Sequence, residues 1–126
     1  MIPQTSPLAN YLSSRSALDE AIHRVLSSGR YILGDETAAF ERHFADFIGV
    51  PYAVGVGNGT EALHLALRGL GVGPGHEVIT VSHTAVATVA AVEMCGATPV
   101  LVDIHPASYT MDAALLEKAK SDRTKA

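Results

Sequence analysis

The residues of this sequence best suited to hold a ligand form a glycine-rich turn, Gly57-Asn58-Gly59-Thr60-Glu61. Gly57 and Gly59 carry no side chain, so a bulky anion can approach the backbone N–H groups around them. An apolar run at residues 53–56 precedes the turn, and apolar residues at helical spacing follow it at 63–70. We therefore expect a strand, a tight turn and a helix whose N-terminal amides and dipole point at a phosphate.

The same turn has a purely structural interpretation, in which the glycines only permit the turn and Asn58 or Thr60 caps the helix. It also satisfies the G-x-G-x-x-A form of the dinucleotide fingerprint, through Gly57, Gly59 and Ala62. That fingerprint requires an acidic residue at the end of the next strand. The next strand instead ends in Ser-His, so a small phosphate-bearing cofactor is the better candidate.

Composition excludes several classes of protein. A net charge of −4 leaves no basic surface for nucleic acid, and an apolar fraction of 48% fits a globular domain. The single cysteine, Cys95, cannot form an internal disulfide and suits a reducing compartment. No apolar run is long enough to cross a bilayer, and the N-terminus lacks the features of a signal peptide. We expect a cytoplasmic protein without a nucleic-acid partner, a membrane partner or a metal site.

Helices are predicted first along the chain. Apolar spacing indicates one helix around residues 18–28, ended by Gly29 in a left-handed conformation. A second helix around residues 40–48 carries all three phenylalanines on one stripe, which predicts burial of that stripe. Between the two helices lies a short extended connector that contains Tyr31.

Strands and helices then alternate. Residues 77–81 and 98–102 are apolar and rich in β-branched side chains, which predicts strands. A helix capped by Ser82 or Thr84 is expected between them, and Asp112 is expected to cap the last helix. Such alternation predicts parallel strands covered on both faces. The polar strand ends should converge along one rim; they lie at residues 57–60, 82–85 and 103–105.

Ordered motifs along nearly the whole chain resemble those of the DegT/DnrJ/EryC1/StrS family of PLP-dependent sugar aminotransferases. The motifs are Phe40-Glu41-x-x-Phe44-Ala45, Asn58-Gly59-Thr60-Glu61-Ala62-Leu63, Gly71-Val72-Gly73-Pro74-Gly75-His76-Glu77-Val78-Ile79-Thr80, His83-Thr84-Ala85-Val86-Ala87-Thr88 and Gly96-Ala97-Thr98-Pro99-Val100-Leu101-Val102-Asp103. The resemblance implies an α/β fold, part of the large domain of a fold type I (aspartate-aminotransferase-like) enzyme, a three-layer sandwich with mainly parallel strands. Residues 1–50 would be an N-terminal helical segment, and 51–126 the first, truncated part of the PLP-binding domain.

The resemblance also implies a function. The cofactor would be pyridoxal 5′-phosphate, the enzyme a homodimer, and the reaction an amino transfer from glutamate or glutamine to a nucleotide-linked keto sugar. Such reactions serve polysaccharide or antibiotic sugar biosynthesis. Carried over by position, Gly59, Thr60 and Glu61 match the cofactor-phosphate site, in agreement with the argument from the helix terminus.

Three further residues are carried over by position. The family usually has an aromatic residue, stacked on the pyridine ring, two positions after His83, where this chain has Ala85. His83 either fills the gap, since an imidazole can lie flat on that ring, or is a cap or rim residue. Tyr31 lies in the segment that resembles an N-terminal active-site loop, and it either contacts substrate or packs on the surface.

The groups that would perform PLP catalysis are not found in this sequence. The reaction needs a lysine that holds the cofactor as a Schiff base and an acid beside the pyridine nitrogen. The lysines here, Lys118, Lys120 and Lys125, all lie in or after the last helix, whereas in the family both groups follow the matched segment. The ending at residues 124–126 resembles the opening of the next core strand. We assign no catalytic residue and expect an N-terminal portion that is inactive alone. The alternatives are a dinucleotide-binding oxidoreductase domain and a non-catalytic fragment that associates with a partner chain.

Overall fold

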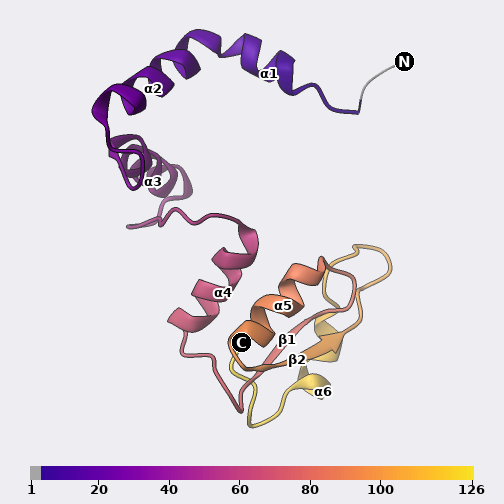
Figure 1. The fold of residues 1–126 in the computed structure, drawn as a ribbon. Helices are drawn as coiled ribbons and strands as arrows, with labels where there is room; N and C mark the ends of the chain where they lie inside the picture. The colour runs from indigo at the N-terminus through magenta and orange to yellow at the C-terminus, as the bar shows by residue number, and fades with distance from the viewer. Residues whose placement is uncertain (1–3) are drawn as a thin grey trace. The chain divides into compact units, whose positions relative to one another are not determined.

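The computed structural model of the chain describes residues 4–126 (Figure 1). The chain divides into two compact units, one that ends at Gly55 and one that runs from Val56 to Ala126. The first unit is helical where it is described, and the strands lie in the second. No helix within residues 4–126 combines the length and the apolar character that a bilayer span requires.

The first unit contains α1 (Pro7–Ser13), α2 (Arg15–Ser28) and α3 (Asp35–Ile48). The sequence did not predict α1, which starts with a proline in its first turn, where the missing N–H has no intrahelical partner to lose. Gly29 ends α2 with φ 68°, as predicted, and Gly49 ends α3 with φ 79°. Both angles lie in the left-handed region that glycine adopts without steric cost.

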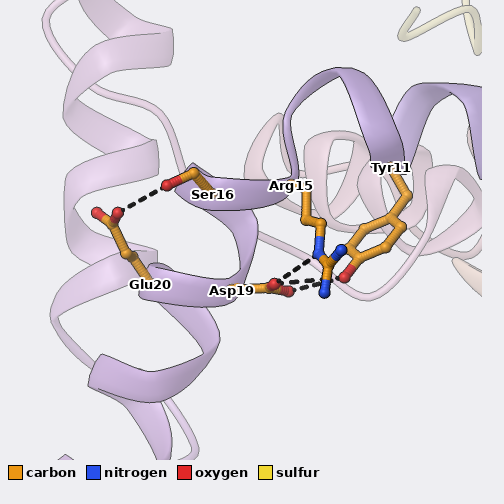
Figure 2. A network of polar contacts seen from close by, with 5 residues as sticks. All are labelled: Tyr11, Arg15, Ser16, Asp19 and Glu20. Atoms are coloured by element: carbon orange, nitrogen blue, oxygen red, sulfur yellow. Dashed lines mark hydrogen bonds and ion pairs between the residues drawn. The ribbon is translucent and has the colours of Figure 1, made fainter.

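Polar side chains join α1 to α2 (Figure 2). The Tyr11 hydroxyl donates to Asp19 Oδ1 at 3.0 Å, and Arg15 Nε donates to Asp19 Oδ2 at 3.3 Å. Hydrogen bonding to the Asp19 carboxylate raises the pKa of Tyr11. One residue further along α2, Ser16 Oγ donates to Glu20 Oε1 at 3.0 Å. Tyr11 is partly exposed and the other four side chains are exposed, so these contacts add little to stability.

The phenylalanine stripe of α3 is exposed, and the prediction of its burial is wrong for the described structure. Phe40 is 59% exposed and Phe47 84% exposed, while the rings of Phe40 and Phe44 pair at 5.7 Å between centroids. Ala45 is the buried residue of this helix. The physical reason is size, because the helices of so small a unit offer little surface against which to bury a stripe.

The second unit contains the α/β part of the chain. Its elements are α4 (Gly59–Gly69), β1 (Glu77–Val81), α5 (Val86–Met94), β2 (Thr98–Val102), the 3-10 helix η1 (Ala113–Leu115) and α6 (Leu116–Ala119). α5 packs against α4 and against both strands. The core beneath it consists of Val72, Val78, Val92, Cys95 and Ala97.

The strands are parallel, as predicted, and in register. Glu77 lies opposite Thr98 and Val81 opposite Val102. On the other side of β1, Thr124 forms a parallel bridge with Glu77, and Ile79 N donates to Ala126 O at 2.9 Å. The spatial order is therefore β2, then β1, then residues 124–126.

Two local predictions need correction, and one is confirmed. Residues 53–56 form no strand, because a strand requires a ladder partner and these residues have none within 4–126. Neither Ser82 nor Thr84 caps α5, whose N-cap position is Ala85 without a side-chain hydrogen bond. Asp112 does cap the last helical segment, since its Oδ1 accepts from Ala114 N at 3.0 Å.

Candidate functional site

The turn before α4 is held by two hydrogen bonds that both involve Glu61. Asn58, the N-cap residue, has an extended backbone with φ −164°, and its Oδ1 accepts from Glu61 N at 2.9 Å. Glu61 Oε2 in return accepts from Gly57 N at 3.0 Å. This is a capping box whose acidic side chain reaches one residue further back than usual. Both the amide and the carboxylate of Glu61 are thus used inside the turn.

Two backbone donors of α4 remain available. Within residues 4–126, neither Gly59 N nor Thr60 N donates a hydrogen bond to the protein, and the first intrahelical bond runs from Ala62 N to Asn58 O at 3.1 Å. A Cβ on Gly59 would meet no atom within 4 Å, so open space lies beside these amides. Capping by Asn58 therefore leaves a pair of N–H groups at the positive end of the helix dipole.

The two glycines of the turn have different reasons to lack a side chain. A Cβ on Gly57 would stand 2.8 Å from Glu61 Oε2, closer than real Cβ contacts. The lack of a side chain at Gly57 therefore permits the carboxylate of Glu61 to reach the N–H of Gly57. Gly59 has no such neighbour, and its missing side chain leaves room for a ligand instead.

The sheet topology marks the end of β1 as a second place for a ligand. Successive strand residues face opposite sides. Val78 packs with the α5 residues on one side, whereas Glu77 accepts a hydrogen bond from Ser121 Oγ at 2.5 Å and pairs with Arg123 on the other. Figure 1 shows α5 and α6 on opposite sides of the strands. The connection from β1 to β2 and the connection from β2 back to residues 124–126 therefore run on opposite faces of the sheet. The strand order reverses beside β1, which marks a topological switch point there.

His83 and Ala85 lie in the loop that leaves this switch point. His83 is exposed, and its ring centroid is 6.3 Å from that of Tyr109, with the ring planes inclined at 54°. Ala85 offers only a methyl group at the N-cap of α5. Tyr109 was not predicted as a site residue, because no motif or periodicity in the sequence singles it out. Its signal is structural, a left-handed backbone with φ 57°.

Tyr31, the candidate substrate residue, belongs to the first unit. Its hydroxyl donates to Leu26 O at 3.4 Å, and its side chain is 66% exposed. It lines a hollow of about 280 Å³ together with Arg24, Val25, Ser28, Arg30, Gly34, Asp35, Glu36 and Thr37. Arg24 Nε donates to Glu36 Oε1 at 2.6 Å, which lowers the pKa of Glu36 and raises that of Arg24.

The structure thus brings the predicted residues together in groups. Gly59, Thr60 and Glu61 share one turn, and His83 and Ala85 share one loop of the same unit. The donors of the turn suit a phosphate, since two amides and the Thr60 hydroxyl make no hydrogen bond within residues 4–126. The end of β1 carries no carboxylate, and a dinucleotide ribose would therefore lack its partner there.

The sequence matches a known family of enzymes and two characterised relatives. The sequence profile of the DegT/DnrJ/EryC1/StrS aminotransferase family matches residues 13–126. The chain is 50% identical, over 99% of its length, to the dTDP-3-amino-3,4,6-trideoxy-alpha-D-glucose transaminase of Streptomyces venezuelae. It is 49% identical, over 89% of its length, to the UDP-2-acetamido-2-deoxy-3-oxo-D-glucuronate aminotransferase of Pseudomonas aeruginosa. It spans only 33% and 31% of these two relatives, about a third of each.

Solved structures show the same likeness. The crystal structure of DesV from S. venezuelae superposes with a TM-score of 0.94 at 50% identity, over 98% of this chain and 33% of DesV. NtdA from Bacillus subtilis, solved with the cofactor PMP, superposes with a TM-score of 0.85 at 28% identity. That match covers 89% of this chain and 26% of NtdA.

Proposed function

The chain belongs to the DegT/DnrJ/EryC1/StrS aminotransferase family, and from that premise we propose that it is the N-terminal part of a PLP-dependent aminotransferase. Its fold is part of the large domain of a fold type I enzyme, and PLP is the cofactor of the family. The proposed substrate is a nucleotide-linked keto sugar, with glutamate or glutamine as amino donor. The names of the relatives, transaminases of dTDP- and UDP-linked sugars, support this substrate class.

One observation carries the proposal for this chain. Asn58 accepts from Glu61 N and Glu61 accepts from Gly57 N, while Gly59 N and Thr60 N donate no hydrogen bond within residues 4–126. We assign these two amides, with the Thr60 hydroxyl, to the phosphate dianion of the cofactor. When bound, PLP supplies an electron sink for the amino group transfer. The residues of this chain hold its phosphate, and His83 is proposed to lie over its pyridine ring beside Ala85. Tyr31 is proposed to contact the sugar substrate.

The proposal places the chemical step outside this chain. The Schiff-base lysine and the acid beside the pyridine nitrogen would come from a segment that follows the matched region, so this polypeptide alone would not transaminate. We further propose a cytoplasmic homodimer as the complete protein. The homodimer is inferred from the family resemblance, and the buried single thiol of Cys95 suits a reducing compartment.

A pair of variants at Gly59 tests the phosphate site. Gly59→Pro removes one N–H at the first helical position, where proline is well tolerated, and the extended backbone of Asn58 suits the residue before a proline. Gly59→Ala keeps the N–H and places its methyl in open space. The ligand is pyridoxamine 5′-phosphate, which has no aldehyde to react with surface lysines, and pyridoxamine serves as the comparison without phosphate.

Loss of one charge-assisted hydrogen bond should weaken the binding of pyridoxamine 5′-phosphate to Gly59→Pro about tenfold, or ~1.4 kcal/mol. Gly59→Ala carries a Cβ as proline does but keeps the N–H, so it should bind the phosphorylated ligand about tenfold more tightly than Gly59→Pro. Pyridoxamine should bind weakly to the unchanged chain and to both variants. Affinities can be measured by equilibrium dialysis, with circular dichroism to verify that α4 is kept. Equal affinity of the Pro and Ala variants for the phosphorylated ligand would refute the assignment.

A further inference from the structure

The loops that follow β1 and β2 leave the sheet side by side, at the carboxyl ends of the two parallel strands. The parallel register ends with Val81 opposite Val102, and Ser82 N donates to Val102 O at 2.9 Å. Neighbouring strands lie about 4.8 Å apart, so side chains from the two loops stand over adjacent strand ends. His83 belongs to the first loop and Tyr109 to the second.

The rings of these two residues form an aromatic pair. A centroid separation of 6.3 Å and an inclination of 54° lie within the range of favourable edge-on contacts. His83 is exposed, and Tyr109 is 68% exposed. The pair therefore adds little to the hydrophobic core, and core packing does not explain why Tyr109 stands beside the imidazole.

Tyr109 is also fixed in an unfavourable backbone conformation. Its φ of 57° is left-handed, which is uncommon for a bulky residue. Two backbone hydrogen bonds close the loop around it, from Tyr109 N to His105 O and from His105 N to Thr110 O, each at 2.9 Å. An antiparallel bridge between Ile104 and Met111 closes the base. The loop thus sets where the ring stands, and strain of this kind clusters at functional sites.

We propose that Tyr109 is a positioning residue that holds the His83 imidazole where it can lie over the pyridine ring of the cofactor. Ala85 has only a methyl group, so the loop after β1 provides no aromatic neighbour for the imidazole of His83. Tyr109 provides the neighbour from the adjacent loop and acts through His83. This inference rests on the proposed function, because it presupposes a pyridine-bearing phosphate at the Gly59 turn.

The experiment compares two ligands on the full 126-residue chain, pyridoxamine 5′-phosphate and inorganic phosphate. Tyr109→Asn removes the ring but keeps a residue that accepts the left-handed backbone. Tyr109→Phe keeps the ring. Tyr52→Asn, which replaces a tyrosine that is 87% exposed in the first unit, is the matched control. The NMR signals of the His83 ring protons report separately on the aromatic pair.

Tyr109→Asn should weaken the binding of pyridoxamine 5′-phosphate about threefold, leave inorganic phosphate unchanged and shift the His83 ring protons. Tyr109→Phe should restore the unchanged ratio of the two affinities, and Tyr52→Asn should not alter it. An equal loss for both ligands, or no loss, would overturn the role of Tyr109. Phosphate binding without a preference for pyridoxamine 5′-phosphate would also overturn it and leave the phosphate site standing. Failure of both ligands to bind the unchanged chain would remove the proposed function and this inference with it.

Discussion

Both hydrogen-bonding groups of Glu61, its amide and its carboxylate, are used inside the turn and not turned toward the proposed ligand. A carboxylate beside a phosphate would repel it, but this one accepts a hydrogen bond from Gly57 N, and the Glu61 amide is bound by Asn58. The side chain therefore holds the shape of the turn while the amides of Gly59 and Thr60 remain available. In the proposed function, Glu61 is thus a positioning residue, and Gly59 and Thr60 are the residues proposed to contact the phosphate.

The stabilisation that the ion pair between Arg24 and Glu36 provides should depend on pH. The hydrogen bond from Arg24 lowers the pKa of the Glu36 carboxyl below its ordinary value of 4.5. A lowered folded-state pKa means that the stabilisation is present above the unfolded-state value and is lost as the pH falls through the folded-state pKa. The link between α2 and α3 should accordingly persist at neutral pH and weaken in acid.

An NMR titration of the Glu36 carboxyl carbon measures this directly. It should titrate below 4.5 in the unchanged chain and return toward 4.5 in Arg24→Gln. Arg15→Gln, which removes an arginine that pairs with Asp19 and not with Glu36, is the control and should leave the pKa of Glu36 unchanged. A Glu36 pKa that does not respond to Arg24→Gln would contradict the assigned cause.

At the level of elements, residues 124–126 are tied to β1 by a buried carboxylate. Glu77 is 7% exposed, accepts from Ser121 Oγ and pairs with Arg123. Lys125 N then donates to Glu77 O at 2.9 Å, which begins the parallel ladder on this side of β1. A buried charge without partners is costly, so the contacts of Glu77 with Ser121 and Arg123 fix where residues 124–126 join the sheet.

The double variant Ser121→Ala, Arg123→Ala tests this clamp. Loss of both partners of Glu77 should speed amide hydrogen exchange of Lys125 about tenfold or more, because its hydrogen bond to Glu77 O opens more often. Lys120→Ala, an exposed change in the same segment, is the control and should leave that exchange rate unchanged. Unchanged exchange in the double variant would show that the ladder holds without the clamp.

Sequence patterns predicted the elements whose determinants are local. Helical spacing gave α2 to α5, β-branched runs gave β1 and β2, and Gly29 and Asp112 ended or capped their helices as expected. The strand at residues 53–56 and the burial of the α3 phenylalanines were not realised, because both depend on partners and not on their own pattern. Tyr109 escaped prediction because its backbone conformation and its ring contact arise only when the loops after β1 and β2 close.

At the scale of the whole molecule, the chain consists of two units and spans about a third of its relatives. The second unit holds the candidate phosphate turn and the switch point of the sheet, and the first holds the Tyr31 loop. The proposed function gives the chain the task of holding the cofactor phosphate, while the chemistry depends on residues elsewhere. The amides of Gly59 and Thr60 are therefore the groups on which the proposed cofactor binding depends most.

The most direct test follows those amides in ¹H–¹⁵N spectra of the chain during titration with pyridoxamine 5′-phosphate. The N–H signals of Gly59 and Thr60 should shift downfield and saturate with the ligand, while pyridoxamine leaves them in place. If these two signals stay fixed while other amides respond to the phosphorylated ligand, the phosphate is not held at this turn, and the central claim is wrong.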